Sequence, residues 1–530
     1  MTISAIDEGC DKQLSNRKLA ATIGKSTMFG IIARWAQIGT RFVTIPIVIA
    51  HLGLGGYGIW SIIMTTAAYM RFGSMGTKAA FQKYVADATG DGDFEKANKL
   101  LSTGCAVMLG LSLTGLIPVA LLSHRLAEAA GVPPEFLSSA SVAISVLAVI
   151  MVLSNVGSVY EAIVMGGHRV DLIGKSSVLI TLAESTAIVV VLHFGNGLLA
   201  MAIVMAVSGL ASVVVCFRLA RKVMPQVRVE RQFITASVVR ELVRFAGSYQ
   251  LVNILEVLYA SILPVAVLRV FGADASGVYA VVTRLTSSVL MFHDAFLLPI
   301  LSGGAMVYAS GSAQNMRLLL IKSYKVTLGV SLFPLAFLSA FGTTIVLAWT
   351  GQTDPSFRIA MYLICLAGPF KAFSLLGLVL YRVSGRAVLD NIRQGLRIVI
   401  LLLIAFFSRR LGFYGILSGL ATAEFIGAIF MLYATKKTFS FFRLRDLVPD
   451  TLKLSLALAL ILAAGFFSSW IPLPLAASVR TIEALRLGII CTGCVAAVWP
   501  ALLISRSVSA AEGKALLSIL FFRPSAQVAA

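Results

Sequence analysis

Apolar stretches long enough to cross a lipid bilayer recur along almost the whole chain, and they constrain the fold more than any other feature. A membrane-spanning helix needs about 20 apolar residues, and the 530-residue chain is 58% hydrophobic and only 13% charged. This composition, with only six cysteines, excludes a large soluble enzyme, a disordered chain and a disulfide-stapled secreted domain. The sequence predicts an all-α polytopic membrane protein with about 14 transmembrane helices. The predicted spans are residues 27–50, 57–79, 100–122, 138–164, 171–193, 197–218, 245–269, 278–301, 322–349, 358–381, 391–408, 412–435, 453–471 and 484–505.

The charged residues favour one orientation of these spans. Lys and Arg number 44 and Asp and Glu 24, which gives a net charge of +20. On a soluble chain this excess would indicate nucleic-acid binding, but in a membrane protein basic residues collect in cytoplasmic loops. Most of the basic residues lie in the alternate loops that include both termini, so we expect both termini in the cytoplasm and no nucleic-acid partner. Six lie in the opposite loops: Arg125, Arg269, Arg358, Arg409, Arg410 and Arg480.

An internal repeat divides the chain into two halves. The turn Leu52–Trp60 shares two glycines and a closing aromatic with Phe271–Tyr279, at an offset of 219 residues. The offset returns, within two residues, in further matches: Ala88-Thr89-Gly90 with Ala309-Ser310-Gly311, Gly167-His168 with Gly385-Arg386, Gly195 with Gly412, and Gly209 with Gly427. Because the offset covers six predicted helices, an even number, the halves insert the same way up.

The repeat predicts two six-helix lobes in parallel repeat plus two C-terminal helices. The expected parts are a cytoplasmic N-terminal tail (1–26), an N-lobe (27–218), a basic cytoplasmic linker (219–244), a C-lobe (245–435), helices 13 and 14 (436–505) and a cytoplasmic tail (506–530). Such repeats favour a transporter with its site between the lobes.

Five basic residues fall inside predicted spans, where ionisable groups are costly and usually face a cavity or a partner. Arg34 and Arg41 lie seven residues apart on one helix face, with Gln37 between them. We predict a substrate-binding site for an anionic group; the alternative is snorkelling to the membrane interface. The five predicted residues are Arg34, Arg41, Arg71, Arg284 and Lys371.

Five acidic residues within the spans are candidates for proton coupling, because burial lets a carboxyl group load and release a proton. They are Glu161, Glu184, Glu256, Asp294 and Glu424. The alternative is a neutral or ion-paired structural acid. No catalytic constellation, metal motif or phosphate-binding loop stands out, so we expect no enzyme activity, metal or cofactor. The pair Cys491 and Cys494 lies in an apolar stretch without a second pair, which favours helix packing.

Several of these motifs resemble those of a known family. The L-G-x-x-x-Y-G-hydrophobic-W pattern at Leu52–Trp60, the segment Gly73–Val85, the turn Gly277-Val278-Tyr279 and the loop Gly166-Gly167-His168 are similar to polysaccharide transporters, the Wzx-type flippases. These belong to the multidrug/oligosaccharidyl-lipid/polysaccharide exporter superfamily, and the resemblance covers roughly residues 20–440. Family members often have an acid two residues before the glycine aligned with Gly73. This chain has Arg71 there, so any role of that acid does not carry over.

The resemblance implies movement of undecaprenyl-diphosphate-linked oligosaccharide from the inner to the outer leaflet of a bacterial plasma (inner) membrane, for O-antigen, capsule or exopolysaccharide. The lipid tails would stay in the bilayer while the polar part crosses a basic cavity between the lobes by alternating access. Expected partners are the lipid-linked oligosaccharide, membrane lipids, a polysaccharide polymerase and a chain-length regulator. The alternatives are a proton- or sodium-coupled multidrug/cation antiporter of the same superfamily, a lipid II flippase, and a membrane glycosyltransferase or polymerase.

Overall fold

Every regular element in the described part of the chain is a helix, as the apolar spans predict. The structure, a computed structural model, describes residues 4–70, 81–82, 85, 87, 92–167, 169–309, 311–384, 388–438, 445, 447–468, 470–471 and 478–504. The chain divides into two compact units, residues 1–280 and 281–530. The boundary of the units falls within a long kinked helix, α7 (Ala236–Ala309).

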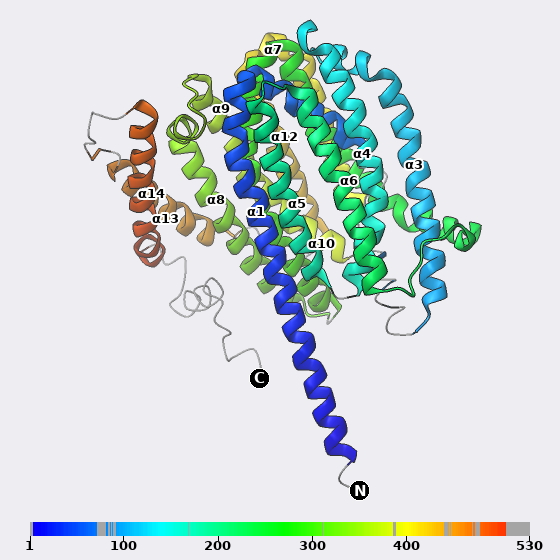
Figure 1. Ribbon diagram of the computed structural model, residues 1–530. Helices are drawn as coiled ribbons and strands as arrows, with labels where there is room; N and C mark the ends of the chain where they lie inside the picture. Colours follow the sequence, from blue (N-terminus) through cyan, green and yellow to red (C-terminus); the bar gives the residue numbers. More distant parts are fainter. Residues whose placement is uncertain are drawn as a thin grey trace. The chain divides into compact units, whose positions relative to one another are not determined.

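The first unit is a bundle of long helices (Figure 1). Its helices before α7 are α1 (Ser4–Ala68), α3 (Phe94–Ala129), α4 (Pro134–Gly166), α5 (Val170–His193) and α6 (Leu198–Val223). Helix α4 packs against both α3 and α6, and α1 packs against α5. A fully buried core cluster joins α3, α4 and α6 through Leu101, Met108, Val159, Ile163 and Ala220.

The second unit contains the rest of α7 and seven further helices. They are α8 (Ala313–Thr350), α9 (Ser356–Cys365), α10 (Ala367–Val383), α11 (Val388–Phe406), α12 (Ser408–Thr438), α13 (Val448–Ser468) and α14 (Val479–Ile504). Helix α12 packs against α10 and α11, while α13 and α14 pack against each other and against α8. Arg480 at the start of α14 donates to the carbonyls of Ala348 and Trp349 on α8, at 3.2 and 2.8 Å. The two helices outside the repeat are therefore attached to the second half.

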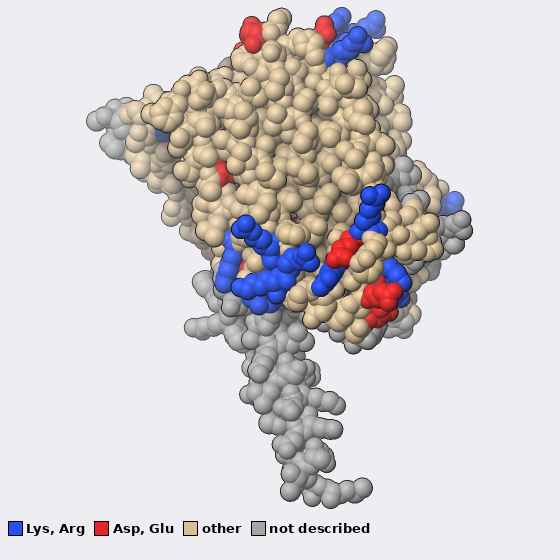
Figure 2. Space-filling view, turned by 45° about the vertical axis from the view of Figure 1, so that its right-hand side comes forward, with Lys and Arg blue, Asp and Glu red and all other residues tan. Residues whose placement is uncertain are grey.

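The surface of the described helices is apolar where a soluble protein would be charged. Leu121, Phe194 and Phe406 are 79%, 76% and 81% exposed, and many other large apolar side chains share this exposure. Figure 2 shows a mostly uncharged face, with Lys and Arg side chains gathered in its lower part and a smaller charged group at its top. Large apolar surfaces are unfavourable in water but are solvated by lipid. Eleven helices of the described chain are long and apolar enough to cross a membrane, so this is a multi-pass membrane protein.

Two kinked helices and one polar helix account for the difference between the eleven candidate spans and the predicted fourteen. Helices α1 and α7 each run through two predicted spans, with kinks at Gly53 (φ 74°) and Gly272 (φ 85°). Helix α11, which carries Asp390, Arg393 and Arg397, is not among the eleven. The count of fourteen stays a prediction.

Backbone geometry confirms the internal repeat. Eight described glycines have positive φ, a conformation that side chains other than glycine rarely adopt. They form four pairs at offsets of 217 to 220 residues: Gly53 with Gly272, Gly92 with Gly311, Gly131 with Gly351, and Gly195 with Gly412. Gly90, which the sequence pattern matches to Gly311, lies outside the described residues, and Gly92 has the matching backbone.

Candidate functional site

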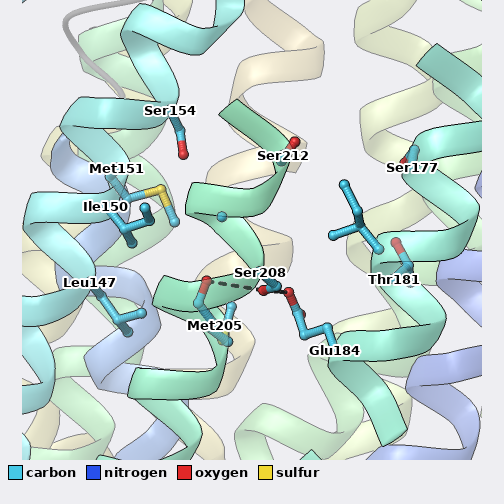
Figure 3. Close-up of a pocket in the computed structure, with 12 residues that line it drawn as sticks. Leu147, Ile150, Met151, Ser154, Ser177, Thr181, Glu184, Met205, Ser208 and Ser212 are labelled. Atoms are coloured by element: carbon cyan, nitrogen blue, oxygen red, sulfur yellow. Dashed lines mark hydrogen bonds between the residues drawn. The ribbon is translucent and has the colours of Figure 1, made fainter. Parts of the chain in front are cut away.

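A polar pocket of about 240 Å³ lies inside the first unit, between α4, α5 and α6 (Figure 3). Five hydroxyl side chains and one carboxylate line it, a polar lining within otherwise apolar membrane helices. The polar lining residues are Ser154 of α4, Ser177, Thr181 and Glu184 of α5, and Ser208 and Ser212 of α6. Leu147, Ile150, Met151, Ile180, Met205 and Gly209 complete the wall.

Glu184 is the ionisable group of this pocket. Its carboxylate accepts a hydrogen bond from the Ser208 hydroxyl, which also lies 3.1 Å from the carbonyl oxygen of Met205 (Figure 3). A hydroxyl has one proton to donate and can also accept. When Glu184 is ionised, the Ser208 proton serves the carboxylate. When Glu184 is protonated, it can donate to the Ser208 oxygen, whose own proton then turns to Met205. The site therefore satisfies Glu184 in both protonation states.

Arg41 on α1 brings a positive charge to the same site. Helix α1 packs against α5, and the charge of Arg41 acts on the Glu184 carboxylate. The Arg41 residue itself is exposed. The structure thus brings together one predicted substrate-binding residue and one predicted proton-coupling residue, which lie 143 positions apart in the chain.

The other predicted site residues are spread over both units. Glu161 on α4 is half-buried and Glu256 on α7 is exposed in the first unit, and Arg284 on α7 and Lys371 on α10 are half-buried in the second. The Nε atom of Arg284 is buried without a hydrogen-bond partner in the described structure. Arg71 and the side chains of Arg34 and Asp294 lie outside the described part. A basic cavity shared by the five cations remains a prediction.

A buried charge network in the second unit is not evident from the sequence. Arg393 donates from Nε and Nη2 to Asp390 Oδ1, at 3.1 and 2.8 Å. Arg397 donates to Gln394 Oε1 at 2.6 Å and forms an ion pair with Glu424 of α12. These five residues, the α11–α12 network, are each no more than 6% exposed.

The spacing of the network residues on α11 is visible in the sequence. Asp390, Arg393, Gln394 and Arg397 follow the i, i+3, i+4, i+7 spacing of one helix face. When charges are only counted, Arg393 and Arg397 are grouped with the cytoplasmic loop charges that flank span 391–408. The count therefore does not reveal that they share one helix face. Glu424 takes the ion-paired form that is the alternative to proton coupling. Gly427 on α12 leaves room for the arginine stems, because a Cβ there would lie 3.1 Å from Arg397 Cδ.

The polar lining of the pocket around Glu184 is not repeated at the matched positions of the second half. The offset of 218 that relates Gly209 to Gly427 places apolar residues or glycine at every polar position of the pocket. The matched residues are Ala372, Gly395, Val399, Leu402, Ile426 and Phe430. The carboxylate and hydroxyl groups of this pocket are therefore not matched at this offset among the described residues, and they do not follow from the repeat.

The fold and these sites define a polytopic helical membrane protein with two repeat-related halves and ionisable groups inside its membrane segments. Residues 23–303 match a family model described as "Polysaccharide biosynthesis protein". This is more than half of the chain, so the chain belongs to that family.

Solved structures with the same fold are transporters of the MOP superfamily. The lipid II flippase MurJ in its inward closed conformation is 13% identical, with a TM-score of 0.67 over 91% of this chain and 98% of its own. An inward-facing MATE multidrug resistance transporter is 15% identical, with a TM-score of 0.61 over 77% of this chain and 94% of its own. A MOP superfamily transporter from Pyrococcus furiosus is 15% identical, with a TM-score of 0.56 over 80% and 94%. No curated relative matches the sequence.

Proposed function

We propose that this protein is a flippase that moves undecaprenyl-diphosphate-linked oligosaccharide from the inner to the outer leaflet of a bacterial inner membrane. The product would supply a cell-surface polysaccharide such as O-antigen, capsule or exopolysaccharide. The observation that carries the proposal is a carboxylate in a polar pocket of the membrane helices, Glu184, on which the charge of Arg41 acts, in a chain of the polysaccharide biosynthesis family. The two repeat-related halves support alternating access as the mechanism.

The substrate's diphosphate is the group that Arg41 would bind. A diphosphate taken out of water needs cations and hydrogen-bond donors, and an arginine guanidinium supplies both. Arg34, Arg71, Arg284 and Lys371 are the other cations that we propose for this binding site. The lipid tails remain in the bilayer throughout, so only the diphosphate and sugars need a polar path.

Glu184 would couple substrate binding to a proton. While Glu184 is ionised, its negative charge balances that of Arg41. Protonation makes the site one unit more positive, which favours the arriving diphosphate, and Ser208 and Met205 accommodate the protonated acid. Release of the proton restores the negative charge of Glu184, which again balances the charge of Arg41, and this favours release of the substrate. Glu161, Glu256 and Asp294 are the other proposed coupling acids, and Glu424, which is ion-paired with Arg397 in the structure, is a further candidate.

Replacing Arg41 by Ala should lower the flipping rate at least tenfold, since a lost charge-assisted hydrogen bond costs about 1.5–3 kcal/mol. The measurement is leaflet accessibility of an undecaprenyl-diphosphate oligosaccharide in proteoliposomes. Arg125→Ala, which removes an exposed charge from the loop end of α3, should behave as wild type. A normal rate for Arg41→Ala would remove Arg41 from the site. Proton-driven cation uptake without any lipid movement by the wild-type protein would instead support the antiporter alternative.

Replacing Glu184 by Gln should separate coupling from binding. The amide keeps an oxygen that accepts from Ser208 but cannot release a proton. We expect flipping down a substrate gradient to continue while its response to an imposed pH gradient disappears. Glu135→Gln, an exposed acid in the first turn of α4, is the matched control and should keep the response. If Glu184→Gln still responds to the pH gradient, another acid carries the proton.

A further inference from the structure

The stretch that runs from the last turns of α6 into the following segment carries a dense group of cations. Between residues 218 and 231 it has five basic side chains and a single acidic one, Glu230. We call the five basic residues the basic strip: Arg218, Arg221, Lys222, Arg228 and Arg231. All five are exposed.

Buried polar side chains of α3 hold the backbone of this segment in place. Asn98 Oδ1 accepts from the amide of Arg228 at 2.8 Å, and Ser102 Oγ accepts from the amide of Glu230 at 3.0 Å. Thr103 Oγ1 accepts from the amide of Thr235, also at 3.0 Å. Asn98, Ser102 and Thr103 are 7%, 3% and 0% exposed. The segment therefore lies along the end of α3, as Figure 1 shows in green beside the lower part of that helix.

Apolar side chains attach the same segment to the core of the first unit. Met224 and Val227 are 6% and 3% exposed and belong to the cluster that joins α3, α4 and α6. The backbone is thus fixed on its inner side by burial and hydrogen bonds, while the charged side chains point outward. A fixed backbone loses little entropy when its side chains bind a ligand.

The basic strip begins where the lipid-facing side of α6 ends. The exposed apolar side chains of α6 recur at helical spacing along one face: Ile203, Val207, Leu210, Val214 and Phe217. Arg221 is the next residue on that face, and its guanidinium carbon lies 5.6 Å from the centroid of the Phe217 ring. A charged group one turn beyond a lipid-exposed apolar stripe lies at the depth of the lipid headgroups.

We propose that the basic strip is a binding surface for the headgroups of anionic phospholipids. Its charge matches phosphate, its position matches headgroup depth, and its backbone is held in advance of binding. The proposal does not depend on the flippase function, because it concerns lipids that surround the protein rather than a lipid that is transported.

The test is a titration of the full-length detergent-purified protein with phosphatidylglycerol or phosphatidylcholine, followed by native mass spectrometry. Arg228→Gln with Arg231→Gln should weaken phosphatidylglycerol binding about 25-fold, at about fivefold for each cation removed. Phosphatidylcholine binding should not change. The matched control is Lys436→Gln with Lys437→Gln, two exposed cations in the last turn of α12, which should weaken binding less than twofold.

A second variant tests whether the fixed backbone contributes to lipid binding, and it keeps every charged residue. Ser102→Ala with Thr103→Ala removes two of the hydrogen-bond acceptors and should also weaken phosphatidylglycerol binding. Three results would overturn the proposal: an equal loss in the Lys436/Lys437 control, equal binding of the two lipids by the wild-type protein, or full displacement of phosphatidylglycerol by millimolar inorganic pyrophosphate. The last would assign the basic strip to a free diphosphate group. Unchanged binding in the Ser102/Thr103 variant would refute the role of the fixed backbone.

Discussion

Replacing Gly277 by Ala is expected to destabilise the protein by about 3 kcal/mol, at the upper end of what overpacking costs in a well-packed core. A Cβ at Gly277 would overlap the carbonyl oxygen of Leu54 and lie 2.8 Å from its carbonyl carbon. The contact is reciprocal, since a Cβ at the repeat-related Gly58 would lie 2.6 Å from both Ala273 O and Gly277 N. These neighbours are backbone atoms, which cannot turn aside as a flexible side chain can.

The effect should be visible as a lower midpoint of thermal unfolding in detergent, and Gly58→Ala should reproduce it. Two control variants have the same glycine-to-alanine substitution at positions that have no close neighbour. Gly110 and Gly488 lie in α3 and α14, and a Cβ at either would have no heavy atom of the described residues within 4 Å, so alanine there should be neutral or slightly stabilising. Equal unfolding midpoints for Gly277→Ala, Gly110→Ala and the wild type would show that the two turns are not in close contact in the detergent-solubilised protein.

Replacing Arg397 by Met should cost about 3–5 kcal/mol, because it leaves the Glu424 carboxylate buried without its cation. Glu424→Gln should be destabilising for the complementary reason. The double variant Arg397→Met with Glu424→Leu removes both charges, so we expect it to be more stable than either single variant. Chemical unfolding in mixed micelles is the measurement, and Arg410→Gln on the exposed start of α12 is the control.

The same variants distinguish the two interpretations of Glu424. If Glu424 is a structural member of the α11–α12 network, Glu424→Gln will lower stability and leave the response of flipping to a pH gradient intact. A lost response with unchanged stability would assign Glu424 to proton coupling and contradict the structural role. With Glu424→Leu measured as the second single variant, additive losses in the double variant would show that the ion pair itself contributes no coupling energy.

Local sequence signals predicted the helical elements well because each signal is carried by neighbouring residues. A run of apolar residues determines a membrane helix wherever the rest of the chain goes, since its backbone groups must bond internally in lipid. The glycines of the turns are equally local, and Gly53, Gly195, Gly272 and Gly412 have the positive φ that their matched positions suggest. Helix α11 shows where such local signals are insufficient. Its polar residues resemble the charges that flank a loop, and only the position of Glu424 beside them shows that they form a buried face.

The sequence by itself determined that this chain is a helical membrane protein built from two repeated halves. The length of an apolar stretch and the spacing between matched glycines can be found without knowing which helices pack together. Only the tertiary structure decided which ionisable groups meet. It set Ser208 against Glu184, Arg397 against Glu424, and α1 against α5, where the charge of Arg41 acts on Glu184. These pairs come from different helices, and a helix offers several faces of similar composition. Which face turns inward depends on packing against its neighbours, as the small residue Gly427 shows where α12 packs against Arg397 of α11.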